Sequence, residues 1–222
     1  MKLALFDLDG TLIEKDSDHA FGEFMVACGW ADADTFRAAN DGFHRQYLAG
    51  CLDIGAYIDF ATRPWRERSA AEQQRAVERF MHEVMRPILR DGARALVRRH
   101  LEAGDRVAIV TATNEFITRP IAEAFGVRTL IATELQRDDE QRVTGRVHGV
   151  PSFQAGKVVR VEQWLAGLGY SLRDCETSVF YSDSTNDLAL LEAVSEPVAT
   201  NPTPELEAVA RERGWRILRL FE

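Results

Sequence analysis

The chain has 222 residues, enough for one large domain or for a core with an inserted domain, and its 45% hydrophobic content is that of an ordinary globular protein. A formal net charge of −8 at pH 7 argues against a general nucleic-acid surface. We expect a cytoplasmic protein that does not bind membranes, because no apolar run approaches the ~20 residues of a membrane span and the N-terminus does not resemble a signal peptide. Oligomeric state is left open.

The first predicted element is a buried strand over residues 2–6, followed at once by Asp7, Asp9 and Gly10. Glycine lets the backbone turn there. In an open α/β sheet, ligands bind at the carboxyl ends of the strands. Two carboxylates at such an end need a cation, a proton or both. The simpler alternative is a pair of solvated aspartates, since Asp-Gly is a common turn.

Residues 14–90 have helical character and contain no convincing strand. Asp18 is the expected N-cap of the first helix. Further amphipathic helices are predicted over residues 35–48, 54–62 and 70–85. We interpret this segment as a small helical bundle inserted after the first strand.

From residue 91 onward, helices and strands alternate, which is the signature of a parallel sheet. A β-hairpin is predicted over residues 134–147. We therefore expect an α/β fold with a Rossmann-like, mostly parallel sheet. The core comprises residues 1–14 and 91–222, and the inserted helical domain comprises residues 15–90. The expected strands after the insert cover residues 106–110, 129–132 and 177–181, a short stretch near 198, and 215–220.

Chemically active side chains stand where the predicted strands end. Parallel strands bring such residues to one edge of the sheet. Grouped carboxylates suit a hard cation such as Mg²⁺, while Thr and Lys suit a phosphate. Taken singly, each residue is more simply a helix cap or a solvated side chain. The residues at the strand ends are Asp7, Asp9, Thr111, Asp183 and Asp187, and Lys157 stands just inside a predicted helix start.

Four motifs in this order resemble the haloacid dehalogenase superfamily of aspartate-nucleophile phosphatases. They are DLDGT at Asp7–Thr11, the apolar run into Thr111, Lys157, and SDSTND at Ser182–Asp187. The helical insert resembles the type 1 cap of the phosphoserine phosphatase-like subclass IB. One departure is Ser182, where many relatives carry Gly, and we expect it to be tolerated.

The resemblance implies a role for each motif residue. Asp7 would be the nucleophile that forms an aspartyl-phosphate, and Asp9 would be the general acid and base. Mg²⁺ would be the cofactor, held by Asp7, the Asp9 carbonyl and Asp183, with Asp187 orienting its waters. The phosphate would be held by Gly10, Thr111, Ala112, Lys157 and Asn186.

The implied substrate is a small phosphorylated amino metabolite. In phosphoserine phosphatases a cap acid binds the substrate amine and a cap Arg binds its carboxylate. Here Asp16 matches the acid, but Asp59 stands where the Arg is expected. An Asp facing a carboxylate is repulsive, so the departure favours an amine without a carboxylate. The alternative is that Arg63 or Arg66 serves instead.

Histidinol phosphate has that character, and phosphoserine is the second choice. The imidazole of histidinol phosphate would suit the aromatic and polar residues His19, Phe21 and Phe43. Two other functions stay open: phosphoryl transfer to an alcohol from the same Asp7, and a non-catalytic binding module on the same scaffold. Retention of all four motifs argues against the last.

Overall fold

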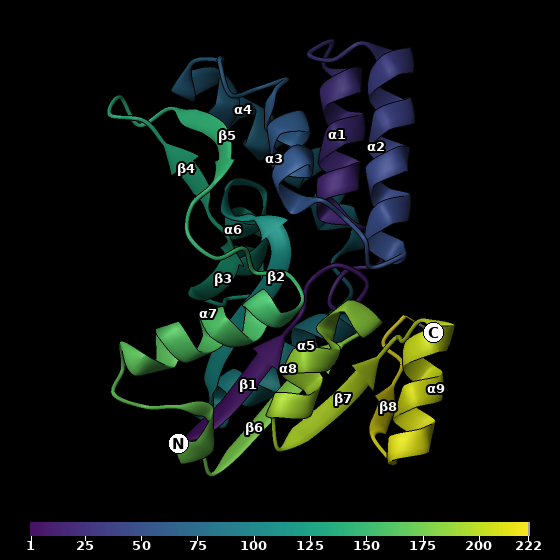
Figure 1. The fold of residues 1–222 in the computed structure, drawn as a ribbon, viewed down its shortest axis with the longest axis vertical. Coiled ribbons are helices and arrows are strands. Elements are labelled where there is room, and N and C mark those ends of the chain that lie inside the picture. The colour runs from purple at the N-terminus through teal and green to yellow at the C-terminus, as the bar shows by residue number, and fades with distance from the viewer. Residues whose placement is uncertain (222) are drawn as a thin grey trace.

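The computed structural model describes residues 1–221, and its centre is one parallel sheet. The strand order is β3-β2-β1-β6-β7-β8, with every neighbouring pair parallel (Figure 1). The first strand of the sequence therefore lies in the middle of the sheet, and the predicted fold class is confirmed. The strands are β1 (Lys2–Phe6), β2 (Arg106–Asn114), β3 (Thr129–Thr133), β6 (Thr177–Ser182), β7 (Glu196–Thr200) and β8 (Arg216–Leu218).

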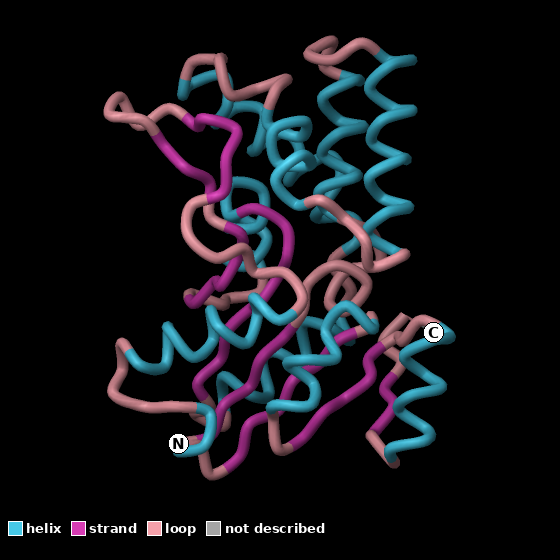
Figure 2. The backbone as a smooth tube through the Cα atoms, in the orientation of Figure 1, coloured by secondary structure: helices cyan, strands magenta, loops and turns pink. Residues whose placement is uncertain are grey.

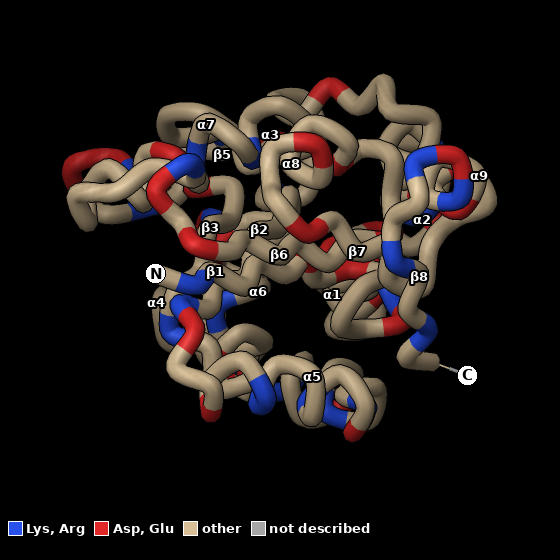
Figure 3. Tube along the Cα trace, turned by 90° about the horizontal axis from the view of Figure 1, so that it is seen from below, with Lys and Arg blue, Asp and Glu red and all other residues tan. Residues whose placement is uncertain are grey.

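Helices cover both faces of this sheet, as the apolar character of the strands requires. Ala4 and Phe6 pack in one apolar cluster, while Leu3 and Leu5 pack in another on the opposite face. Figure 3 shows α5 on one side of the strands and α7 and α8 on the other. The helices are α5 (Asp91–Glu102) and α6 (Glu115–Ala124) on the first face, and α7 (Ala155–Ala166), α8 (Leu188–Ala193) and α9 (Pro204–Arg213) on the second.

A group of helices inserted between β1 and α5 stands over the carboxyl end of the sheet (Figure 1). Between residues 15 and 90, a part of the chain that is described throughout, no strand is present (Figure 2). We call this segment the helical insert. It comprises α1 (Ser17–Ala27), α2 (Ala33–Leu48), α3 (Ile54–Thr62), α4 (Ala70–Phe80), the π-helix η1 (Met81–Met85) and the 3-10 turn η2 (Arg86–Ile88).

The start of α1 corrects one expectation. Its N-cap is Asp16 rather than Asp18, because the Asp16 backbone is extended and its carboxylate accepts the His19 N–H at 2.8 Å. A cap must lie two or three residues before the N–H that it accepts. Asp18 instead lies in the first turn of the helix and is buried.

The predicted hairpin is formed by β4 (Leu135–Arg137) and β5 (Val143–Val147). It packs against α3 of the helical insert and forms no ladder with the main sheet (Figure 2). Gly145 has a φ of +81° and leaves no room for a side chain beside Arg66. Among the residues that the structure describes, no helix is long and apolar enough to cross a membrane.

Candidate active site

Three buried side chains form an ion-pair network where β1 and β6 end. Lys157, in the first turn of α7, donates from Nζ to Asp7 Oδ1 at 2.8 Å and to the Asp187 carboxylate at 2.7 Å. Ser182 Oγ also donates to Asp187 at 2.7 Å. Ser182, which departs from the family pattern, thus holds the Asp187 carboxylate, and this carboxylate orients Lys157.

Burial governs the electrostatics of this network. It raises the pKa of Asp7 to about 6, against the opposing effect of Lys157. For Lys157, burial alone would lower the pKa, but the charges of Asp187 and Asp7 outweigh it and raise the pKa. One ammonium therefore faces two carboxylates, and the site is left with net negative charge.

A third carboxylate, Asp183, approaches the network through Thr11. The Thr11 hydroxyl lies 3.2 Å from Asp7 Oδ2 and 3.2 Å from Asp183 Oδ1. Gly10 has a φ of +77°, and a Cβ there would collide with the Asp183 carboxylate. Burial, followed by repulsion from Asp7 and Asp187, raises the pKa of Asp183 well above its ordinary value. Thr11 belongs to the first motif, but the sequence alone assigned it no role.

Asp7 and Asp183 are oxygen donors of the kind that Mg²⁺ prefers. Within residues 1–221, no three His, Cys, Asp or Glu side chains converge into a ready metal site. Mg²⁺ usually keeps several waters and needs only one or two carboxylates. The repulsion between these carboxylates would be relieved by a cation, so the donor set fits Mg²⁺.

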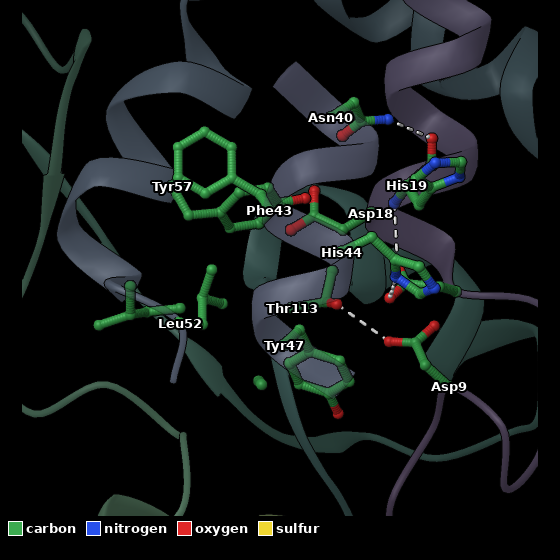
Figure 4. Close-up of a pocket in the computed structure, with 13 residues that line it drawn as sticks. Asp9, Asp18, His19, Asn40, Phe43, His44, Tyr47, Leu52, Tyr57 and Thr113 are labelled. Atoms are coloured by element: carbon green, nitrogen blue, oxygen red, sulfur yellow. Dashed lines mark hydrogen bonds and ion pairs between the residues drawn. The ribbon is translucent and has the colours of Figure 1, made fainter. Parts of the chain in front are cut away.

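Asp9 occupies a different environment from Asp7. Its Oδ1 accepts the Ser17 N–H at 2.7 Å, and its Oδ2 accepts the Thr113 hydroxyl at 2.9 Å (Figure 4). Burial raises the pKa of Asp9 to about 7, with the charges of Asp16 and Asp7 adding to the effect. The carboxylate faces the helical insert, and its raised pKa makes it better able to carry a proton than an ordinary aspartate.

Thr111 and Ala112 lie inside β2 and not after its end, because the strand continues to Asn114. The Thr111 side-chain oxygen accepts the Thr113 N–H at 3.2 Å, which leaves its hydroxyl proton able to donate. Ala112 lines the cavity below the helical insert.

Two expected phosphate ligands are engaged elsewhere. The Gly10 N–H donates to the Ile13 carbonyl at 2.9 Å, inside the loop that follows β1. The Asn186 amide donates to the Tyr47 carbonyl at 2.8 Å and so joins the core to the helical insert. The single N–H of Gly10 is therefore engaged by a protein acceptor, whereas the Asn186 amide keeps a second N–H that could reach a phosphate.

A cavity lies between Asp9 and the helical insert (Figure 4). Three of the expected specificity residues, Asp16, His19 and Phe43, contribute to its wall. Several other residues that line the cavity could not be recognised from the sequence, because they come from different helices. The lining consists of Asp9, Asp16, Asp18, His19, Asn40, Phe43, His44, Tyr47, Leu52, Ile54, Tyr57, Ala112 and Thr113.

Asp59 is absent from this lining, which corrects the expectation that it faces the substrate. Its carboxylate pairs with Arg63 at 2.5 Å and with Arg66 at 2.6 Å, beside Gly145 of the hairpin. The two candidate arginines are therefore turned away from the cavity as well. Among the described residues, neither Lys nor Arg lines it.

Comparison with known proteins identifies the family. Residues 4–192 match the model of the haloacid dehalogenase-like hydrolases. The chain belongs to this family. The predicted membership and the predicted phosphatase class are thereby confirmed, and relatives of this hydrolase bear the names of phosphatases.

One such relative is histidinol-phosphatase of Neisseria meningitidis serogroup C (strain 8013), which is 44% identical over 97% of both chains. Phosphoserine phosphatase SerB1 of Mycobacterium tuberculosis (strain ATCC 25618 / H37Rv) is 32% identical over 96% of this chain and 69% of its own.

Solved structures agree on the fold. A protein with unknown function from Bordetella pertussis Tohama I has a TM-score of 0.93 at 48% identity, over 99% of both chains. A substrate-bound phosphoserine phosphatase has a TM-score of 0.68 at 18% identity, over 98% of this chain and 92% of that one. At that identity the second likeness concerns the fold alone.

Proposed function

We propose that this phosphatase hydrolyses a small phosphomonoester through an aspartyl-phosphate on Asp7, with Asp9 as acid and base. The observation that carries the proposal is the unequal environment of the two carboxylates. Asp7 lies against the Lys157 ammonium, which favours its ionised form, whereas Asp9 lies against neutral donors and has a pKa of about 7. Contact with a cation on one carboxylate and with neutral donors on the other divides the work between nucleophile and acid.

In the first step, an Asp7 oxygen would attack phosphorus while the leaving alkoxide takes the proton of Asp9. In the second, Asp9 would take a proton from the water that attacks the aspartyl-phosphate, which frees Asp7 and inorganic phosphate. Lys157 and the Thr111 hydroxyl would donate to the phosphoryl oxygens. We further propose that residues 15–90 form a cap that keeps bulk water away from these steps.

Asp7 and Asp183 would hold Mg²⁺, together with the Asp9 carbonyl, and Asp187 would position Lys157. The ion would neutralise charge on the transferring phosphoryl group. Mg²⁺ should therefore raise the melting temperature, because a ligand that binds only the native state stabilises it by about 2.7 kcal/mol at 100 times its Kd. Asp183→Asn should abolish this shift, as measured by calorimetry; an undiminished shift would reject Asp183 as a ligand.

For the substrate we propose histidinol phosphate. The cavity beside Asp9 has acidic and aromatic walls without Lys or Arg among the described residues, which suits a cationic tail and not a carboxylate. The 44% identical relative bears the name histidinol-phosphatase, and this agrees with the proposal.

The test compares kcat/KM for histidinol phosphate and L-phosphoserine, in Mg²⁺ and in EDTA. We expect a strong preference for histidinol phosphate and loss of both activities in EDTA. A preference for L-phosphoserine would reject the substrate, and full activity in EDTA would reject the cofactor. Added alcohols, followed by product analysis, would detect phosphoryl transfer in place of hydrolysis.

A further inference from the structure

The cavity beside Asp9 contains three carboxylates, and two of them have assigned partners. Asp9 accepts hydrogen bonds from the Ser17 N–H and the Thr113 hydroxyl. Asp16 caps α1 and lies 3.4 Å from His44 Nδ1. These contacts hold both carboxylates in place before any substrate enters.

The third carboxylate, Asp18, is 6% exposed and lines the same cavity from the first turn of α1 (Figure 4). Its contacts are neutral: the Asn114 amide donates to Oδ1 at 3.5 Å, and the Tyr57 hydroxyl hydrogen-bonds to the carboxylate. A buried carboxylate is costly unless it is paired with a positive group or takes up a proton. Burial, with Asp16 and Asp9 adding to it, raises the pKa of Asp18 well above its ordinary value.

The walls around Asp18 suit a flat, positively charged group. Phe43 and Tyr57 have ring centroids 5.3 Å apart at an angle of 59°. Leu52 and Ile54 complete an apolar wall. Aromatic rings attract a cation over their faces, and a carboxylate at the end of such a pocket adds a charge-assisted hydrogen bond.

We propose that Asp18 determines substrate specificity by binding the imidazole end of the substrate, at the side of the cavity opposite the phosphate. The substrate class is a phosphomonoester whose far end carries a protonatable ring nitrogen. This inference rests on the proposed function, because it needs the phosphate of the substrate to lie near Asp7 and Asp9.

The first test uses Asp18→Asn, with histidinol phosphate and p-nitrophenyl phosphate as substrates. Losing the charge should lower kcat/KM for histidinol phosphate about 10- to 100-fold, mainly through KM, because a hydrogen bond to a charged group is lost. Hydrolysis of p-nitrophenyl phosphate should change less than about 3-fold, since that ester has no cation for Asp18 to bind.

Asp53→Asn is the matched control. It removes the same charge from an exposed residue next to Leu52 and Ile54, and Asn still caps α3. Both substrates should be hydrolysed as by the wild type. Equal losses on the two substrates in Asp18→Asn would mean a structural role and overturn the inference, as would no loss on either.

The second test uses only the wild-type protein. In the wild type, histidinol should inhibit p-nitrophenyl phosphate hydrolysis competitively at a concentration at least about 10-fold lower than phenylalaninol, which has the amine but no ring nitrogens. Equal inhibition by the two would overturn the role of Asp18. A wild type that hydrolyses no phosphomonoester would overturn the proposed function itself, which separates the two failures.

Discussion

At the scale of single residues, the decisive contrast is between two aspartates separated by one leucine. Asp7 points to Lys157, and Asp9 points to Ser17 and Thr113 on the side of the helical insert. In an extended strand, residues i and i+2 point to the same face. The different directions of Asp7 and Asp9 therefore arise in the turn after β1 and not in the strand. This turn gives two identical side chains different hydrogen-bond partners and different proposed tasks.

Asp7→Asn should therefore abolish turnover, because an amide cannot form the aspartyl-phosphate. Asp9→Asn should slow hydrolysis about 10²- to 10⁴-fold through loss of acid–base catalysis. Both changes are nearly isosteric, so circular dichroism should show an unchanged fold. Wild-type-like hydrolysis by Asp7→Asn would refute the assignment of the nucleophile.

Gly10 permits a test of how closely this turn approaches Asp183. Gly10→Ala should lower the free energy of unfolding by about 1–3 kcal/mol, because the new Cβ meets the Asp183 carboxylate at a strained φ. Gly29→Ala is the control: its φ is +70°, yet nothing lies within 4 Å of the position that the new methyl group would take. Urea denaturation of the two variants separates the effect of the contact with Asp183 from the effect of the strained φ. Equal losses of unfolding free energy would show that the contact with Asp183 is unimportant.

At the scale of elements, a pair of polar contacts joins α1 to α2. His44 Nδ1 lies 3.4 Å from Asp16 Oδ2, and His19 Nε2 lies 2.8 Å from Asp41 Oδ1. The hydrogen bond between His44 and Asp16 is the main cause that raises the pKa of this histidine above 6.5. For Asp16, burial would raise the pKa, but the hydrogen bonds from His44 and the His19 N–H lower it below 3.8.

These shifts define a pH window. The raised pKa of His44 contributes stability that is fully present below pH 6.5 and is lost as the pH rises through the folded-state value. The lowered pKa of Asp16 contributes stability that is present above pH 3.8 and is lost as the pH falls through its folded-state value. The ion pair therefore stabilises the protein in mildly acidic solution.

His44→Gln should lower the free energy of unfolding by about 0.5 kcal/mol near pH 5.5, a modest value because solvent screens the partly exposed imidazole. The difference from the wild type should shrink as the pH rises to about 8.5, above the folded-state pKa. Thermal unfolding across this pH range measures the difference, with His82→Gln as an exposed control in η1. A difference that grows with pH would contradict the ion pair.

At the scale of the whole molecule, the helical insert is tied to the core next to the proposed site. Gln154 Nε2 donates to the Gly50 carbonyl at 3.0 Å, and Asn186 donates to the Tyr47 carbonyl at 2.8 Å. The cavity beneath them has only about 30 Å³ of free space. Ligand sites usually measure about 300–1,000 Å³, so a substrate that fills this enclosed cavity needs the insert to open, whereas the adjoining cleft that reaches Gly10 and Asp183 already has about 700 Å³.

Gln154→Ala should make this opening more frequent. The lost hydrogen bond to the Gly50 carbonyl is worth about 1 kcal/mol, so amide exchange in residues 47–52 should accelerate about 5-fold. Gln74→Ala is the control, because the Gln74 amide donates to Glu78 of its own helix and does not bridge the insert to the core. Unchanged exchange in Gln154→Ala would show that this contact does not hold the insert closed.

The order of strands and helices, the family and the turn that carries Asp7 and Asp9 could all be predicted from the amino-acid sequence. Apolar runs and glycines act over a few residues, and local periodicity reports such short-range preferences. The rule that parallel strands end at one edge then brought Asp7 near Lys157, although 150 positions separate them. The extra residues of β2 were missed because Thr111-Ala112-Thr113 carries no boundary signal of its own.

Which side chains meet across the helices was visible only in the folded structure. Asp59 pairs with two arginines beside the hairpin, Asn186 reaches the Tyr47 carbonyl, and Asp18 lines the cavity. Each outcome depends on how α2, α3 and the hairpin pack over the sheet. Spacing along the chain records the face of a helix on which a residue lies, but it does not record which other element covers that face.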